Sequence, residues 1–185
     1  MSQIDRLVAN YQRFVQLPWP SNLAEAQRVW FAVYPPAEER RLRVRLGEFE
    51  VATLAAKRRW RLVDLTAVPA RWLAAHDYRE GYFEDPEALE TIEEELRKQV
   101  VGTLREACQA EEVDPNTVVA VLGAGSLFGF AHVSTVIGEL EGIIRGRLLV
   151  FFPGEYERNL YRFMDARDGF NYMATPITCS ERMPL

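Results

Sequence analysis

Apolar residues in this chain follow two spacings, one typical of buried strands and one typical of amphipathic helices. Four short and nearly continuous apolar runs predict strands, namely "RVWFAVY", "WRLVDL", "TVVAVLG" and "RLLVFFPG". Elsewhere apolar residues recur every three or four positions, which predicts helices over residues 3–16, 37–56, 68–75, 86–110 and 127–144. Strands that alternate with helices favour a parallel sheet covered by helices on both faces.

The last part of the chain departs from this alternation. Two aromatic-rich runs flank "DARDG" (165–169), whose Asp-Gly pair is typical of a turn, and predict a hairpin or an edge strand. The segment "HDYREGYFEDP" (76–86) is predicted as a loop. We therefore predict an α/β fold over residues 1–185: a single three-layer, Rossmann-like domain with about five mainly parallel strands and an N-terminal helix within residues 1–17 packed against it.

Composition and charge limit the class of protein. The chain is 48% hydrophobic and 26% charged, with no apolar run as long as a membrane span and no secretory apolar segment at its start. Cys108 and Cys179 are expected to be reduced thiols, so we expect a cytoplasmic protein with no membrane association. The net charge of -5 argues against direct, non-specific binding to DNA.

Charge is nevertheless segregated along the chain. Between Arg40 and Arg61 there are eight basic residues against two acids, Glu48 and Glu50, whereas Glu84 to Glu95 contains seven acids and no base. The ordinary interpretation is two solvated helix faces. The alternatives are complementary patches that orient a partner or a homodimer, and a DNA contact through Arg40 to Arg61.

The third strand runs into a glycine-rich turn, as strands do at nucleotide-binding sites. The candidate ligand-binding residues are Gly123, Gly125, Ser126 and Gly129, with Glu155 after the fourth strand where an acid would meet a ribose hydroxyl. However, the turn follows the third strand and not the first, and residues 111–144 contain no lysine or arginine. We therefore interpret it as a structural turn and keep a degenerate nucleotide- or anion-sensing module as the alternative.

Residues that carry catalytic chemistry are sparse. His132 falls inside the predicted helix 127–144 and is interpreted as a core histidine, while His76 ends a predicted helix. Asp64 ends a strand, where it resembles a magnesium ligand but equally a helix cap beside Thr66. No His or Cys cluster has metal-site spacing. We predict no catalytic residue, no cofactor and no metal.

The helix predicted over 37–56 has two apolar faces. Leu42, Leu46 and Phe49 form one stripe, and a second stripe lies on the opposite side: Val44, Gly47, Val51, Leu54 and Ala55. One stripe can face the sheet, so the other faces a neighbouring helix of the same domain or a protein partner. With the aromatic residues of 76–86, the candidate partner interface consists of Val44, Val51, Leu54, Arg43, Tyr78, Tyr82 and Phe83.

Five segments, taken in order, are spread over most of the chain, from Gln27 to Ile177: "QRVWFAVYPPAEERRLRVRLGEFE", "RLVDLT", "HDYREGYFE", "GAGSLFGFAHVS" and "RGRLLVFFPGEYERNLYRFMDARDGFNYMATPI". In these segments the chain resembles the BrxB family of the BREX bacteriophage-exclusion systems. The resemblance implies a non-catalytic component of a cytoplasmic complex that modifies host DNA and blocks phage replication. It further implies association with the phosphatase-like protein PglZ and other BREX proteins, as a scaffold or adaptor, and it transfers no catalytic residue.

Overall fold

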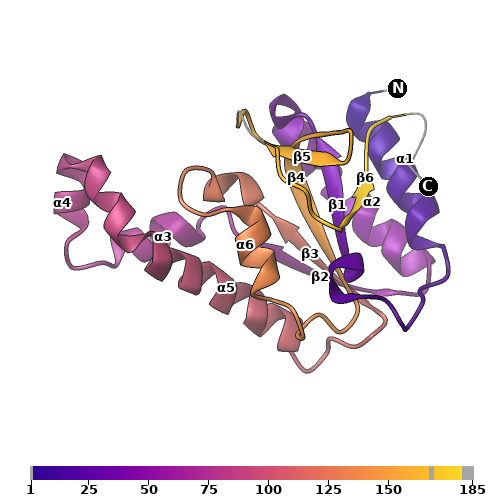
Figure 1. Cartoon of the computed structure of the whole chain (residues 1–185). Coiled ribbons are helices and arrows are strands. Elements are labelled where there is room, and N and C mark those ends of the chain that lie inside the picture. Colours follow the sequence, from indigo (N-terminus) through magenta and orange to yellow (C-terminus); the bar gives the residue numbers. More distant parts are fainter. Residues whose placement is uncertain (1, 167–168, 181–185) are drawn as a thin grey trace.

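A mainly parallel sheet forms the centre of the protein in the computed structural model, which describes residues 2–166 and 169–180. The six-stranded sheet has the order β2-β3-β4-β1-β6, and β5 pairs antiparallel with β4 (Figure 1). The strands are β1 (Val29–Tyr34), β2 (Arg59–Asp64), β3 (Thr117–Leu122), β4 (Arg147–Glu157), β5 (Leu160–Phe163) and β6 (Thr175–Ile177). The α/β, Rossmann-like prediction is confirmed, and β6 is an edge strand near the chain end, but the β4-β5 hairpin turns at Arg158 and Asn159 and not at the predicted residues 165–169.

Helices cover both faces of this sheet. The α-helices are α1 (Gln3–Val15), α2 (Glu39–Ala55), α3 (Val68–Ala74), α4 (Arg79–Glu84), α5 (Glu93–Gln109) and α6 (Val133–Gly138). The described residues also form 3-10 helices between them, namely η1 (Glu25–Arg28), η2 (Pro36–Glu38), η3 (Pro86–Ile92) and η4 (Ala124–Leu127). Buried residues of α1 and α2 pack on one face, and those of α5 and α6 pack on the other.

The strand order explains why the helices divide in this way. From β1 the chain crosses with α2 to β2 at the far edge, and it then returns through β3 to β4, which lies beside β1. Crossovers between parallel strands are almost always right-handed. Because the return runs in the opposite direction along the sheet, its helices α5 and α6 must lie on the face opposite to α2.

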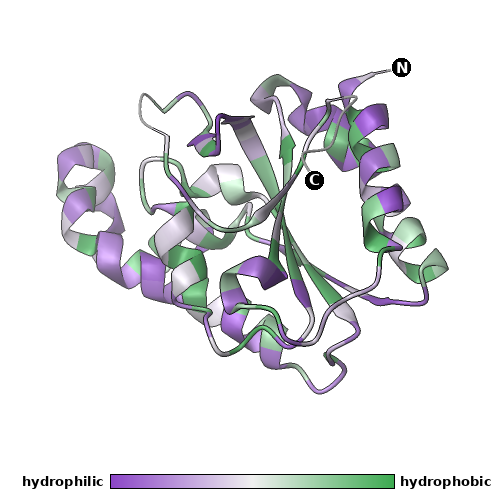
Figure 2. Ribbon diagram, turned by 45° about the vertical axis from the view of Figure 1, so that its right-hand side comes forward, coloured by the Kyte–Doolittle hydropathy of each residue, from purple (hydrophilic) through white to green (hydrophobic). Residues whose placement is uncertain are grey.

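The central strands are buried on both sides, as their continuous apolar runs predict. On β1, Trp30, Ala32 and Tyr34 face α1 and α2, whereas Phe31 and Val33 face α5 and α6. Figure 2 shows the hydrophobic colour concentrated on the central strands, while the surrounding helices alternate between hydrophilic and hydrophobic residues. Each face of the sheet therefore has its own apolar core.

Several predicted boundaries are wrong. The single helix predicted over 127–144 is instead the 3-10 helix η4, an irregular loop and the short helix α6, because Gly129 and Gly142 adopt left-handed φ angles of 84° and 80°. The helix predicted over 86–110 is divided into η3 and α5. The predicted loop 76–86 contains α4, and Arg167 and Asp168 of the predicted turn lie outside the described residues.

Strand β2, predicted as an apolar strand, is only partly buried. It is an edge strand with β3 as its sheet neighbour, and Leu62 is 42% exposed. The sequence "RWRLVD" already carries the polar residues of a half-exposed strand, with Arg61 between the apolar positions.

Two neighbouring positions on α2 test the assignment of its inner face. Leu42 is fully buried, so Leu42→Ala is expected to lower the free energy of unfolding by about 2–5 kcal/mol. Val44 is 83% exposed, and Val44→Ala is expected to change it by no more than about 0.5 kcal/mol. Urea unfolding followed by circular dichroism measures both, and equal losses would contradict the assignment.

Candidate functional site: the outer face of α2 and the glycine turn

The second apolar stripe of α2 faces solvent. Within it Val44 is 83%, Val51 66% and Leu54 53% exposed, and Gly47 and Ala55 are exposed as well. We call these five residues the outer stripe. Among the described residues no helix covers it, so the alternative of a neighbouring helix in the same domain does not hold for this part of the chain. Exposed apolar residues grouped on one helix face are typical of interaction surfaces.

The inner face of α2 is held firmly in place. The ring of Phe49 contacts Tyr11 of α1 and Phe151 of β4, with centroids 5.1 and 4.9 Å apart. The hydroxyls of Tyr11 and Thr53 form a buried hydrogen bond of 2.6 Å. These contacts fix the helix against both α1 and the sheet, so the outer stripe lies on a rigid support.

Ion pairs fix the flank of α2 that faces α1. Arg45 pairs with Asp5 and Glu48. Hydrogen bonds from Ser2, assisted by the nearby Arg45 guanidinium, lower the pKa of Asp5 to about 2. Asp5 is therefore charged at neutral pH, and its ion pair with Arg45 adds to the buried packing between α1 and α2.

The other flank of α2 is tied to the end of β2 through Arg43. Its guanidinium donates to Glu39 Oε1 (2.8 Å) and to Thr66 Oγ1 (2.7 Å), and lies 3.5 Å from Asp64 Oδ2. Partial burial favours the neutral form of Asp64, but hydrogen bonds from Thr66 and the charge of Arg43 lower its pKa below the usual value. Arg43, predicted as an interface residue, thus has partners within the chain.

Gly47 has no packing role within the described residues. A Cβ atom added to it would meet no atom within 4 Å, and the residue is exposed in the middle of a helix. Glycine at such a position destabilises a helix by roughly 0.5–1 kcal/mol relative to alanine. Because Gly47 has no side chain, the surface of the outer stripe is flat at this residue, and the backbone of another element can approach it closely.

The other predicted interface residues lie elsewhere. Tyr78 is 74% and Phe83 70% exposed on the segment around α4, whereas Tyr82 is half-buried against the ring of His76, 5.2 Å away. Figures 1 and 2 both show this segment projecting from the sheet on the side away from α1 and α2. The predicted interface is therefore two separate surfaces.

The acidic segment from Glu84 to Glu95 and the basic segment from Arg40 to Arg61 differ in how much of their charge is paired within the chain. Every acid from Glu84 to Glu95 is exposed, and within the described residues only Glu94 among them forms an ion pair, with Lys98. In contrast, five of the basic residues between Arg40 and Arg61 form ion pairs with acids of the chain: Arg41, Arg43, Arg45, Arg59 and Arg61. These pairs reduce the positive charge that this segment presents to a polyanion such as DNA.

The glycine turn packs against the end of β2. Gly123 has a left-handed φ of 79°, and a Cβ atom there would lie 2.6 Å from the backbone nitrogen of Thr66. Ser126 Oγ donates to the carbonyl oxygens of Leu65 (3.1 Å) and Gly123 (2.8 Å), which joins the turn to the loop after β2. These contacts give Gly123 and Ser126 a structural role in the fold.

The remaining candidate residues of the turn do not converge on one point. A Cβ atom added to Gly125 would be in ordinary contact with Pro153 and Met164, and Glu155 lies on β4, where it pairs with Arg162 of β5 at 3.4 Å. The turn continues into the 3-10 helix η4, of four residues, and not into the N-terminus of an α-helix that would face a phosphate.

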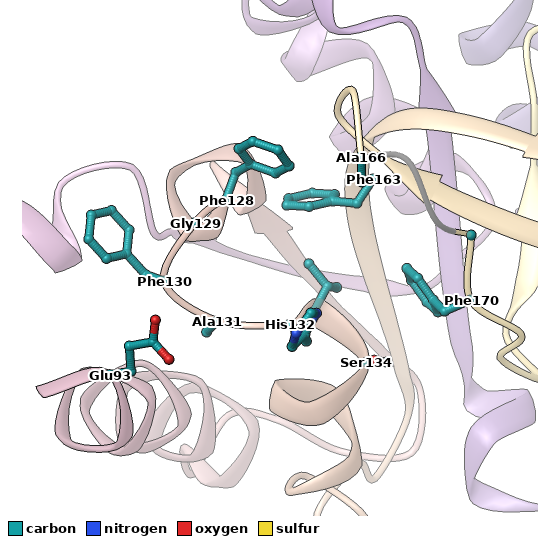
Figure 3. Close-up of a pocket in the computed structure, with 12 residues that line it drawn as sticks. Glu93, Phe128, Gly129, Phe130, Ala131, His132, Ser134, Phe163, Ala166 and Phe170 are labelled. Carbon is teal, nitrogen blue, oxygen red and sulfur yellow. The ribbon is translucent and has the colours of Figure 1, made fainter. Parts of the chain in front are cut away.

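Gly129 borders a pocket of about 420 Å³ beside the turn, shown in Figure 3. Its lining includes the rings of Phe128, Phe130, Phe163 and Phe170, together with His132 and Glu93. His132 precedes α6 and is exposed, so its prediction as a core histidine is wrong. Within the described residues no hydrogen bond joins the side chains of His132 and Glu93, and the pocket is mainly aromatic. The sequence did not indicate the contribution of Phe163 and Phe170.

The two thiols are in environments that suppress their reactivity. Burial raises the pKa of Cys108 to about 11 and that of Cys179 to about 11, so both are protonated at neutral pH. Across residues 2–166 and 169–180 no group of three or more His, Cys, Asp or Glu side chains is arranged to hold a metal ion. No helix in the same residues has the length and apolar character needed to cross a membrane.

Known proteins give no further guide to this site. No family model, curated protein or solved structure matches the chain. Function is therefore inferred from the geometry of these surfaces and from the resemblance in the sequence.

Two substitutions in the turn test its structural role. Gly123→Ala is expected to lower the free energy of unfolding by about 2 kcal/mol or more, because alanine meets a left-handed φ and a backbone clash. Gly125→Ala, where contacts are ordinary, is expected to change it by less than about 1 kcal/mol. Urea unfolding without added ligand measures both values. Equal stability of the two variants would show that the turn does not require Gly123.

Proposed function

We propose that this chain is a non-catalytic scaffold or adaptor subunit of a BREX anti-phage complex. In this proposal it binds the phosphatase-like PglZ protein through the outer stripe of α2, and so supports host DNA methylation and phage exclusion. The identity of the complex rests on the sequence resemblance. The observation that favours an adaptor is the exposure of Val44, Val51 and Leu54 on a helix whose inner face is fixed.

The chemistry of the outer stripe supports a protein partner. Its centre is aliphatic, and charged residues on both sides, such as Arg41 and Glu50, form a polar rim. Interfaces commonly combine an apolar centre with such a rim, because burial of the centre stabilises the complex while the rim aligns it. A second copy of this chain would meet the same chemistry, and the size of the assembled complex distinguishes a homodimer from a partner.

Two aspartates in the outer stripe test the surface. In Val51→Asp plus Leu54→Asp, association would bury two charges, so co-purification with PglZ is expected to be lost. Both side chains are exposed, so circular dichroism of the double variant is expected to match the parent. The matched control is Gln99→Asp plus Gln109→Asp, which adds the same charge at exposed positions of α5. Co-purification that survives the α2 variant, or is lost equally in the control, would rule out the surface.

Gly47→Ala separates the stability of the helix from the requirements of the interface. Because a Cβ atom at this position meets open space, the free energy of unfolding of the variant is expected to be roughly 0.5–1 kcal/mol higher than that of the parent. If a partner backbone approaches Gly47, the same variant binds PglZ more weakly. Gly102→Ala on α5, where a Cβ atom also meets nothing within 4 Å, should gain stability with binding unchanged. Denaturation and a binding titration measure the two effects, and unchanged affinity for Gly47→Ala would exclude close approach at that point.

A further inference from the structure

A second pocket, of about 390 Å³, lies at the amino ends of the sheet strands. Four arginines line it: Arg28 just before β1, Arg58 before β2, and Arg145 and Arg147 at the start of β4. Trp19 and Asn116 complete its principal lining, and no Asp or Glu is among the described residues that line it. We call it the arginine pocket. It shares no residue with the outer stripe and lies at the opposite end of the strands from the glycine turn.

The arginines are oriented by neutral acceptors. Arg28 Nη1 donates to the carbonyl oxygens of Ile144 (3.2 Å) and Arg145 (3.0 Å), and Arg147 Nη2 donates to that of Pro20 (3.1 Å). These bonds hold the guanidinium groups in place but leave their charges uncompensated.

The other two arginines are held in the same manner. Arg145 Nη1 donates to the carbonyl oxygen of Val113 (3.0 Å), and Arg58 donates to the amide oxygen of Asn116. Among the described residues, none of the four arginines of the pocket forms an ion pair. The other arginines between Arg40 and Arg61, by contrast, mostly have carboxylate partners.

Positive charge is concentrated around one aromatic ring. The guanidinium carbons of Arg58 and Arg147 lie 4.2 and 4.8 Å from the centre of the Trp19 ring, and Arg147 is only 4% exposed. Burial, together with the charges of Arg28 and Arg58, lowers the pKa of Arg147 to about 10. Like charges are thus close enough to destabilise one another, which an anion between them would relieve.

Several donors of the same pocket also lack an acceptor. Trp19 Nε1, Arg28 Nε and Arg58 Nε are buried, and none of them has a hydrogen-bond partner among the described residues. A buried donor without an acceptor destabilises the protein unless a bound group supplies one. A negatively charged group with acceptor oxygens would match the positive charge and the donors of this pocket.

We propose that the arginine pocket binds a phosphate group. A phosphate presents several charged oxygens, and the planar guanidinium group matches this geometry through paired N–H donors. The convergence of guanidinium groups from three separate segments on one pocket favours a discrete phosphate over the backbone of a DNA duplex lying across the surface. The site is distinct from the proposed PglZ surface and does not depend on it.

Calorimetry with inorganic phosphate, at constant ionic strength adjusted with chloride, tests the site on the full chain. Saturable binding with one site is expected. Arg58→Gln is expected to weaken it by at least about tenfold, since it removes a charge-assisted hydrogen bond and one positive charge. The matched control is Arg40→Gln, at an exposed position outside the pocket, which should bind like the parent. No saturable binding to the parent chain, or equal affinity of both variants, would overturn the proposal.

Two further ligands identify the source of the phosphate. AMP that binds more tightly than inorganic phosphate would indicate a nucleotide, whereas equal affinity would indicate the phosphate alone; adenosine is expected not to bind. A short DNA duplex that binds more tightly than AMP and is equally sensitive to Arg58→Gln would overturn the assignment of a discrete phosphate. Thermal unfolding in phosphate gives a second readout on the parent chain, because a ligand that binds the folded state raises Tm. The Tm rise should be smaller in Arg58→Gln than in Arg40→Gln.

Discussion

The pairing of β1 with β4 at the centre of the parallel sheet is the constraint on which the rest of the structure depends. Six consecutive residues of β1 are paired with β4, and the paired residues of both strands are buried on both faces. A sheet buried in this way needs a helical layer on each side, and right-handed crossovers determine which helices form each layer. Helix α2 therefore packs on one face through Leu42 and Phe49, while the rest of its circumference remains outside the core.

The same constraint separates the possible sites. The carboxyl ends of the strands carry the glycine turn, where Gly123 and Ser126 serve contacts within the fold, and the aromatic pocket beside it. The amino ends carry the arginine pocket, where Arg28, Arg58 and Arg147 have no counter-charge among the described residues. The outer stripe belongs to neither end. An adaptor with one face for a partner and a separate site for a small anion is consistent with this division of the surface.

The sequence predicts the fold well where local pattern and burial agree. The strand "VWFAVY" and the two-sided pattern of α2 could be assigned because neither depends on distant residues. The helix over 127–144 was wrong because Gly129 and Gly142 take left-handed conformations that apolar spacing does not report. The arginine pocket was not found because its members come from segments far apart in the sequence. Only the folded chain brings these strand ends together. It then shows that carbonyl oxygens accept hydrogen bonds from the arginines and that no Asp or Glu is among the described residues lining the pocket.

The outer stripe of α2 is the proposed interaction surface of this protein. The most direct measurement places a photoreactive amino acid at Val51, which is 66% exposed, and irradiates cells that express the complete BREX system. The expected result is a covalent adduct between this chain and PglZ, with no adduct when the same group is placed at the exposed Gln99 of α5. No adduct at Val51, together with a PglZ adduct at Gln99, would contradict the claim.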